Sequence, residues 1–325
     1  MIKDAILEQL WKNADTYISG AELARILSVS RTAVWKTIEQ LRSEGYLVES
    51  VTNRGYRLLS ESDVLSEEGI RRYLRRKDLT LEIFKSLSST NTVLKSRAVN
   101  GAPEGLALIA GEQTEGRGRM GRSFYSPSDS GIYLSLLLRP EISAVEATNI
   151  TACAAVAVAE AIEELSGIQT EIKWVNDVLV KGKKVCGILT EASMDIESGL
   201  ISYVIVGIGI NTSIPAGDFP EELRRIAGAI FEEKRIPELR CHMAAAVLDK
   251  LMGYYEHLGD KSYFEEYKKR SIVLGKPINI LAPGKTPVPA KVLDLDRDFA
   301  LLVQLNDGSI ERVNSGEVSV RVAGK

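Results

Sequence analysis

The stretch KVCGILTEASMDIESGLISYVIVGIGI, residues 184–210, decides the fold of the largest part of the chain. It holds two apolar runs, residues 184–189 and 203–210, and a polar segment separates them. Each run is short for a helix but long enough for a buried strand, and turn residues bound it. The stretch therefore predicts two strands of a largely buried sheet.

Two further apolar runs, residues 106–110 and 132–138, predict two more strands upstream. Between the two pairs of runs, residues 147–165 show a helical pattern with many small side chains, which allow close packing on a sheet. Strands and helices that follow one another in this way indicate an α/β or α+β layer built on a mixed sheet.

Residues 19–45 predict a helix-turn-helix motif. Ser19 and Glu22 form a capping box that begins a first helix, Ser30 caps a second helix, and Gly45 ends it. The side chains expected to be buried are Leu23, Ile26 and Leu27 in the first helix and Val34, Ile38 and Leu41 in the second.

A hairpin wing is predicted next, with residues 46–48 and 56–59 on either side of a turn. Between residues 25 and 57 there are six basic and three acidic side chains, a local excess that contact with phosphates requires. We therefore predict DNA binding by Ser30, Arg31, Thr32, Lys36 and Arg54. The alternative is a module that docks on its own chain or on another protein. Trp35 is expected to pack rather than to stack on bases.

The composition is that of a globular protein with two or three domains. The chain has 325 residues, of which 45% are hydrophobic and 26% charged, and its net charge of −3 argues against wholesale coating of nucleic acid. Three widely spaced cysteines and only two histidines argue against a zinc site. The sequence shows no signal-peptide pattern and no apolar stretch long enough to cross a bilayer, so we expect a cytoplasmic protein.

The run GRGRMGR, residues 116–122, places three glycines and three guanidinium groups in seven residues. Glycine lets backbone N–H groups approach an anion, and arginine supplies a planar fork of donors that fits phosphate or carboxylate. The run predicts a loop over a phosphorylated ligand. Taken alone, it equally fits a solvated basic turn or a nucleic-acid patch.

Four polar clusters lie at the ends of the apolar runs, where ligand sites are usually assembled. They are SSTN at 88–91, EQ at 112–113, KWVND at 173–177 and KK at 183–184. The chain lacks the Gly-x-x-x-x-Gly-Lys-Ser/Thr signature, which excludes a P-loop nucleotide site. The GIGIN motif at 207–211 lacks the third glycine of a dinucleotide fingerprint.

Taken in order, these motifs resemble those of the biotin protein ligases. With a winged helix-turn-helix in front of them, the chain resembles the bifunctional bacterial form, which is both biotin ligase and biotin operon repressor. Two positions depart from the family pattern: Val175 stands where many relatives have proline, and Phe124 where a tryptophan often packs on the adenylate. Neither change removes a polar group, so we expect altered packing or affinity rather than lost chemistry.

The resemblance runs over essentially the whole chain and implies a multidomain α+β fold. It implies a winged helix-turn-helix domain at residues 1–60, an α/β mixed-sheet catalytic domain of the biotin/lipoate ligase type at 66–271, and a small SH3-like β-barrel at 272–325. In the last of these, Ser315-Gly316-Glu317-Val318 resembles the C-terminal barrel of the family.

The implied reaction joins biotin and ATP to biotinyl-5′-AMP and pyrophosphate, and then transfers biotin to a lysine of a biotin carboxyl carrier protein. The first step brings a carboxylate against a phosphate, so cations must neutralise two anions that repel each other. Lys184 and Arg119 are the expected catalytic cations. Asp177 either holds Mg²⁺ or orients Lys184, and the sequence does not separate these roles. The structural alternatives are a turn residue for Asp177 and a surface lysine for Lys184.

The positions that match the motifs of the biotin protein ligases imply which residues contact the ligands. Those for biotin are Ser89, Thr90, Asn91, Gln113, Gly116, Arg117, Arg119, Gly121, Lys184 and Gly187. Those for the nucleotide are Arg119, Arg122, Phe124, Lys173, Asn176 and Asn211. Ser89 also suits a helix cap and Asn211 a turn. Cys186 is expected to be a small buried residue, because an adenylate is already activated and needs no nucleophilic thiol.

An adenylate is a reactive mixed anhydride, so the 116–122 loop is expected to be mobile when empty and ordered over the intermediate. If the ordered loops also complete a dimer surface, biotinyl-5′-AMP acts as a corepressor and a ligand-promoted homodimer binds operator DNA. Two other functions fit the sequence: a lipoate-type ligase, and a repressor that senses biotin without catalysis. No membrane partner is expected.

Overall fold

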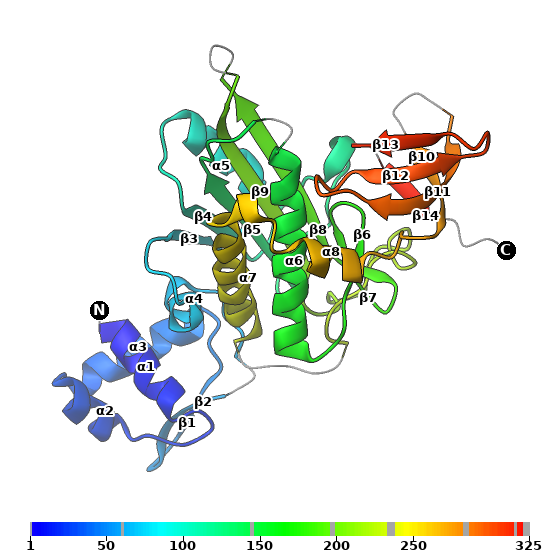
Figure 1. Cartoon of the computed structure of the whole chain (residues 1–325). Coiled ribbons are helices and arrows are strands. Elements are labelled where there is room, and N and C mark those ends of the chain that lie inside the picture. The colour runs from blue at the N-terminus through cyan, green and yellow to red at the C-terminus, as the bar shows by residue number, and fades with distance from the viewer. Residues whose placement is uncertain are drawn as a thin grey trace. The chain divides into compact units, whose positions relative to one another are not determined.

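The computed structural model describes residues 2–59, 62–143, 146–195, 199–232, 238–281, 286–314 and 317–320. The chain divides into two compact units: residues 1–75 with 233–245, and residues 76–232 with 246–325. Figure 1 labels the helices and strands of both. Helix α7, Leu239–Tyr255, begins in the first unit and ends in the second.

The first unit contains the predicted helix-turn-helix and its wing. Its elements are α1 (Ile2–Lys12), α2 (Gly20–Leu27), α3 (Arg31–Ser43), the antiparallel strands β1 (Val48–Val51) and β2 (Gly55–Leu58), and α4 (Glu67–Tyr73). Ser19 Oγ accepts a hydrogen bond from the Glu22 N–H at 3.1 Å and begins α2. Ser30 Oγ accepts one from the Ala33 N–H at 3.1 Å and begins α3. Both predicted caps are therefore confirmed.

The predicted core of this motif is correct except at one position. Leu23, Val34, Ile38 and Leu41 are fully buried, but Ile26 is 41% exposed. Leu23 and Leu27 follow the i, i+4 row that faces the core, and Ile26 lies about 100° around the helix from Leu27. Ile26 therefore lies to one side of that row and faces solvent.

The second unit is built on a seven-stranded mixed sheet, which confirms the predicted sheet. The strand order is β3-β4-β5-β9-β8-β7-β6; β3 and β4 pair in parallel, and the other neighbours pair antiparallel. All four predicted runs are strands. The bounds are β3 (Thr80–Phe84), β4 (Leu106–Ala110), β5 (Gly131–Leu138), β6 (Glu171–Lys173), β7 (Asp177–Val180), β8 (Lys183–Met194) and β9 (Ile201–Asn211).

Helices α5 (Thr90–Val99) and α6 (Ala147–Ser166) cover opposite faces of this sheet. On β8, the Thr190 hydroxyl lies 2.7 Å from the Thr151 hydroxyl of α6, whereas Glu191 accepts a hydrogen bond from Asn91 of α5 at 2.9 Å. Thr190 and Glu191 are successive residues of one strand, so their side chains lie on opposite faces of the sheet. The two helices that they contact therefore lie on opposite faces too. The small side chains of α6 are buried, as the sequence predicted.

The C-terminal part of the second unit is a small antiparallel sheet in the order β13-β12-β11-β10-β14. Its strands are β10 (Pro277–Leu281), β11 (Val288–Leu295), β12 (Leu301–Leu305), β13 (Ile310–Val313) and β14 (Glu317–Val320). Within the described residues the edge strands β13 and β14 do not pair with each other, so the closed SH3-like barrel stays a prediction. Ser315 and Gly316 lie outside the described residues.

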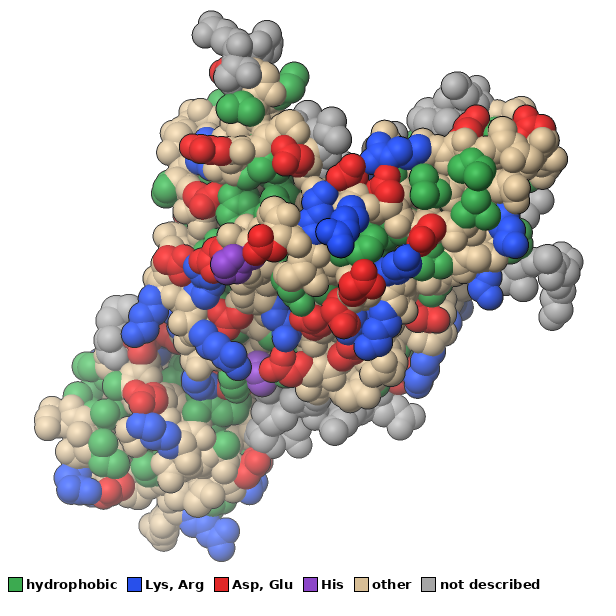
Figure 2. All heavy atoms as spheres, in the orientation of Figure 1, with side chains coloured by type: hydrophobic (Ala, Val, Ile, Leu, Met, Phe, Trp, Pro, Cys, Tyr) green, Lys and Arg blue, Asp and Glu red, His purple; other side chains and the backbone are tan. Residues whose placement is uncertain are grey.

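The surface carries charges of both signs. Figure 2 shows acidic and basic side chains interspersed over the visible face, with small hydrophobic areas between them. This distribution agrees with the small net charge of −3. In the part of the chain that the structure describes, no helix has the length and apolar character needed to cross a bilayer.

Candidate functional site

A cavity lies on the face of the large sheet that α5 covers. It encloses about 440 Å³ of empty space, its open mouth included. Ten of the predicted ligand contacts line it: Ser89, Thr90, Asn91, Gln113, Arg117, Arg119, Phe124, Asn176, Lys184 and Gly187. The fold thus brings together residues from three separate regions of the sequence.

The floor of the cavity is made of glycines on β9. A Cβ atom on Gly207 would lie 2.1 Å from Asn91 Oδ1, and one on Gly209 would lie 2.4 Å from the Phe124 ring. Because alternate residues of a strand share a face, Gly207 and Gly209 both lie on the cavity side. The glycines of the GIGIN motif therefore let Asn91 and Phe124 lie directly on the sheet.

A chain of hydrogen bonds fixes the polar wall. The Thr90 N–H donates to Gln113 Oε1 at 2.8 Å, and Gln113 Nε2 donates to the Ser126 hydroxyl at 3.0 Å. The buried Ser135 hydroxyl donates to Asn91 Oδ1 at 2.6 Å and lies 2.7 Å from the Thr90 hydroxyl. Sequence analysis missed Ser126 and Ser135. Ser135 lies inside the apolar run 132–138. Only the alternation of side chains along a strand could have shown which face of the sheet its hydroxyl is on.

Ser89 has both of the roles considered for it. It lines the cavity, and its side chain accepts a hydrogen bond from the Thr92 N–H at 3.5 Å, which caps α5.

A carboxylate beside the cavity, Glu191, was also missed by the sequence analysis, because it follows the apolar run 184–189 on β8. One of its oxygens accepts the hydrogen bond from Asn91. Its other oxygen lies 3.5 Å from Arg117 Nη1. Glu191 therefore ties the glycine–arginine loop to α5 and β8.

The 116–122 loop is a short hairpin over the cavity. The Phe124 N–H donates to the Gly116 carbonyl at 2.8 Å, and the Gly118 N–H donates to the Arg122 carbonyl at 2.7 Å. A Cβ on Gly116 would lie 2.3 Å from the Phe124 carbonyl oxygen, so this crossing requires glycine. Gly121 and Arg122 lie at the exposed tip and do not line the cavity, and their ligand contacts stay a prediction.

Two polar pairs position the basic side chains. Arg119 Nη1 donates to Asn176 Oδ1 at 2.9 Å, and Asn176 Nδ2 donates to the Ile188 carbonyl at 2.9 Å. Lys184 Nζ lies 2.7 Å from Asp177 Oδ1. Asp177 does not line the cavity itself and reaches it through Lys184. This geometry fits an orienting role for Asp177.

Besides Arg122, two predicted nucleotide contacts do not line this cavity. Lys173 is on β6, opposite Asp177 in the strand register. Asn211 Nδ2 donates to the Gly228 carbonyl at 3.0 Å. The Lys184 backbone also pairs with residues 226 and 228, at 2.8 and 2.9 Å, so Asn211 and Lys184 hold the same segment.

Cys186 is fully buried, and burial raises the pKa of its thiol. A thiol with a raised pKa carries little of the reactive thiolate. The expectation of a small buried residue is thus confirmed.

The basic residues of the helix-turn-helix separate into two groups. Three of the six between residues 25 and 57 form ion pairs: Arg25 with Glu22, Arg42 with Glu39, and Arg57 with Glu49. The other three are exposed and have no carboxylate partner among the described residues; they are Arg31, Lys36 and Arg54. These three are the basic residues that the sequence predicted for DNA.

Burial does not support the expectation that Trp35 packs rather than stacks on bases, since this side chain is 53% exposed. Val34 and Ile38 occupy the core face of α3, and Trp35 lies about 100° around the helix from Val34. It therefore shares the outer face of α3 with Thr32 and Lys36, which are also exposed.

Three family models match the chain. They are an HTH domain over residues 3–57, the biotin/lipoate A/B protein ligase family over 83–211, and the biotin protein ligase C terminal domain over 273–321.

Known proteins are similar over almost the whole length. The bifunctional ligase/repressor BirA of Bacillus subtilis is 37% identical over 98% of this chain and 98% of its own. BirA of Escherichia coli is 28% identical over 94% of each chain. Among solved structures, a biotin protein ligase from Aquifex aeolicus in complex with biotin and ATP is 29% identical, with a TM-score of 0.62, over 74% of this chain and 98% of its own.

Proposed function

Because the chain belongs to the biotin/lipoate A/B protein ligase family, and within it to the bifunctional ligase/repressors, we propose that it is a biotin ligase that also represses transcription. Its substrates are biotin, ATP and a lysine of a biotin carboxyl carrier protein. The observation that carries the proposal is the convergence of Lys184 and Arg119 on one cavity with the polar wall of Thr90 and Gln113.

The polar wall suits the ureido group of biotin. That group needs a few donors and acceptors in an apolar setting, and Gln113 is held by Thr90 and Ser126 in one orientation. Leu134 and the glycines of β9 offer the apolar surface for the rings. We place the biotin contacts at the cavity-lining residues Ser89, Thr90, Asn91, Gln113, Arg117, Arg119, Lys184 and Gly187, with Gly116 and Gly121 in the loop.

The cations perform the first step by charge neutralisation and alignment. A carboxylate oxygen of biotin attacks the α-phosphorus, a new O–P bond forms, and the bond to pyrophosphate breaks. Lys184, held by Asp177, is placed to neutralise both anions, and Arg119, held by Asn176, is placed to bind the phosphate. In the second step the amine of the acceptor lysine attacks the acyl carbon, and AMP leaves.

The adenosine end extends from Lys184 toward Asn211 and the segment 226–228, which these two residues hold. Phe124, whose ring lies 5.9 Å from Lys184 Nζ, is placed to pack on the nucleotide. Mg²⁺ would enter with the phosphates of ATP and would neutralise part of their charge. Among the described residues no three His, Cys, Asp or Glu side chains gather as a metal site, and Asp177 is the carboxylate that we propose for a contact with the ion.

The DNA-binding module supplies the second activity. Arg31, Lys36 and Arg54, which have no carboxylate partner in the part of the chain that the structure describes, suit phosphates, and the outer face of α3 suits the major groove. We propose domains at residues 1–60, 66–271 and 272–325, the last an SH3-like barrel. We also propose a cytoplasmic location and a homodimer that forms when biotinyl-5′-AMP is bound. A dimerisation constant that does not change with biotin and ATP contradicts the last point.

The decisive experiment combines the protein with biotin, Mg-ATP and a biotin carrier domain, and follows the intact mass of the carrier. We expect the mass increase of one biotinyl group, and biotin-dependent exchange of pyrophosphate into ATP. Replacing biotin by lipoate tests the lipoate-type alternative. DNA binding without either reaction would leave a repressor that senses biotin without catalysis.

A further inference from the structure

The turn between β11 and β12 places a bulky residue in a conformation that favours glycine. Phe299 has a φ of 62° and is fully buried. Its N–H donates to the Asp296 carbonyl at 2.9 Å, and the Asp296 N–H donates to the Ala300 carbonyl at 2.9 Å, which closes the turn. A left-handed φ is an outlier for a residue of this size and persists only where the surroundings determine it.

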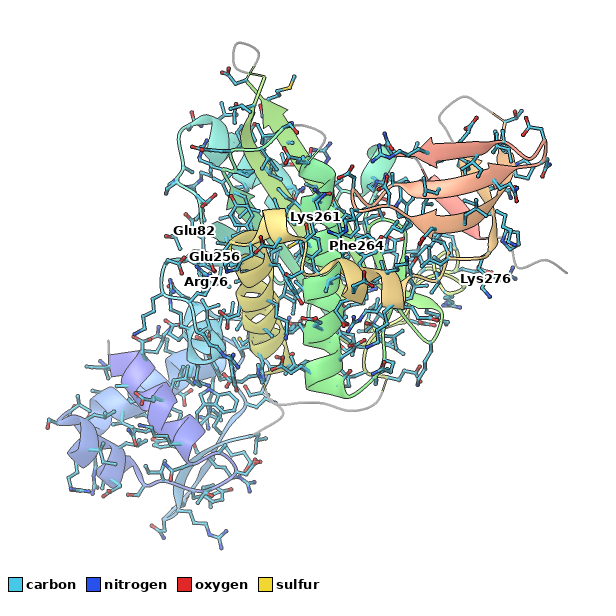
Figure 3. The ribbon with its side chains drawn as sticks, viewed as in Figure 1. Arg76, Glu82, Glu256, Lys261, Phe264 and Lys276 are labelled. Atoms are coloured by element: carbon cyan, nitrogen blue, oxygen red, sulfur yellow. The ribbon has the colours of Figure 1, made fainter. Side chains whose placement is uncertain are left out.

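The surroundings of Phe299 are three aromatic rings beside or on α8, Phe264–Arg270. Its ring stacks on Tyr263 at 5.4 Å and meets Phe264 at 5.5 Å and Tyr267 at 5.2 Å edge-on. Figure 3 labels Phe264 next to Lys261, whose ammonium pairs with Asp298 of the same turn at 2.8 Å. The small C-terminal sheet is thus fastened to the segment around α8 through this turn.

The same turn holds the segment that carries Asn176. Trp174 Nε1 donates to the Phe299 carbonyl at 2.7 Å, and the Tyr267 hydroxyl donates to the Val175 carbonyl at 3.2 Å. Trp174 and Val175 are buried and directly precede Asn176, which accepts the hydrogen bond from Arg119. A continuous path of contacts therefore runs from Phe299 to the guanidinium group at the cavity.

We propose that Phe299 is a positioning residue for the adenylation step: its ring fixes the turn, and its carbonyl fixes Trp174 and so the pair Asn176–Arg119. The inference rests on the proposed function, because that function assigns Arg119 to the formation of the adenylate. The C-terminal sheet then contributes to catalysis without touching a substrate.

The test is Phe299→Leu in the full-length protein, with Lys261→Ala as the matched control. The control removes an ion pair to the same turn but leaves the ring and the carbonyl in place. For Phe299→Leu we expect kcat/KM for ATP in adenylate formation to fall about tenfold or more, because small displacements of a positioning group are costly. For Lys261→Ala we expect no change.

Two readouts separate positioning from a loss of stability. The indole N–H of Trp174, one of three in the chain, gives its own NMR signal, and its proton should exchange faster in folded Phe299→Leu. Trp174→Phe should lower kcat/KM for ATP in the same way, and the double variant should add little to either single one.

The results that would contradict the role of Phe299 differ from those that would contradict the proposed function. No ligase activity in the unaltered protein contradicts the function. An active protein in which folded Phe299→Leu keeps its kcat/KM for ATP and the protection of Trp174 overturns the role of Phe299. Additive losses in the double variant overturn it as well.

Discussion

Lys184 Nζ and Asp177 Oδ1 lie 2.7 Å apart on the neighbouring strands β8 and β7. A lysine side chain has a long flexible stem, and the carboxylate confines its ammonium group at the cavity. The pair is partly exposed, so it adds little to stability, and its value lies in where it holds the charge.

Lys184→Gln should lower the rate of biotin-dependent pyrophosphate exchange by about 10²–10³, since it removes a charge aimed at the reacting anions. Asp177→Asn should cost less, because the ammonium group remains. The exchange assay at several Mg²⁺ concentrations distinguishes the two roles of Asp177. If Asp177 orients Lys184, Asp177→Asn leaves the Mg²⁺ concentration for half-maximal rate unchanged. If Asp177 binds the metal, Asp177→Asn raises that concentration.

Arg119→Gly should weaken retention of the adenylate and allow acylation of lysines on unrelated proteins. Arg119 lines the cavity and is held by Asn176, so its loss opens the loop and removes a phosphate contact. The measurements are the half-life of the bound adenylate and the biotinylation of a bystander protein. Arg122→Gly, at the exposed tip, is the comparison and should change both less. An unchanged half-life and acceptor selectivity in Arg119→Gly would count against the covering role of the loop.

Gly207→Ala should impair both folding and biotin binding. Its Cβ would lie 2.1 Å from Asn91 Oδ1, and Asn91 cannot yield easily because Ser135 and Glu191 hold it. We expect a loss of about 1–3 kcal/mol in the free energy of unfolding. Gly253→Ala in α7 meets nothing within 4 Å and should raise stability by up to about 1 kcal/mol. Thermal unfolding of both variants checks the contrast.

Lys36→Ala should weaken DNA binding, because it removes a cation that contacts a phosphate. The slope of log K against log salt, which is negative, should become less steep by about 1. Arg25→Ala is the control, since Arg25 pairs with Glu22 and should leave the slope unchanged. The fluorescence of the exposed Trp35 offers a direct readout, which should change when DNA covers α3. Equal effects of the two substitutions would argue for docking on protein instead.

Glu163 should make stability depend on pH. Burial would raise the pKa of its carboxyl, but hydrogen bonds from Arg270 and Thr170 outweigh burial and hold the pKa below the ordinary value of 4.5. A lowered pKa means that the pair stabilises the fold above pH 4.5 and that this contribution is lost as pH falls through the folded-state pKa.

Glu163→Gln should therefore cost about 2 kcal/mol at pH 7, and the difference from the unaltered protein should shrink below pH 4.5. Denaturant unfolding at both pH values measures it. Glu266→Gln removes a more exposed partner of the same Arg270 and should cost less than about 1 kcal/mol. A difference that stays constant with pH contradicts the assignment.

Local signals in the sequence were sufficient for much of the fold. The caps Ser19 and Ser30, the apolar runs and the small residues of α6 each act within a few residues, and each led to the observed element. Ile26 and Trp35 are more exposed than expected because both are apolar residues beside a correctly placed core row, and only tertiary packing decides which side of the row is covered.

The site was predictable where family motifs marked it and not where contacts between distant segments build it. Ser135 and Glu191 lie on strands, and their importance comes from Asn91, far away in the chain. Phe299 carries no motif at all. Its role depends on a turn conformation and on an acceptor atom of the backbone, neither of which is visible in a list of residue types.

The first two turns of α7 have a consequence for how this architecture changes in evolution. Residues 238–245 belong to the same compact unit as residues 1–75: the buried Arg240 donates to Asp63 at 3.0 Å, and the buried Glu238 pairs with Arg72. Removing residues 1–75 would take away both Asp63 and Arg72, the partners of these two charges. A descendant that begins after residue 75 would therefore need other residues at positions 238 and 240.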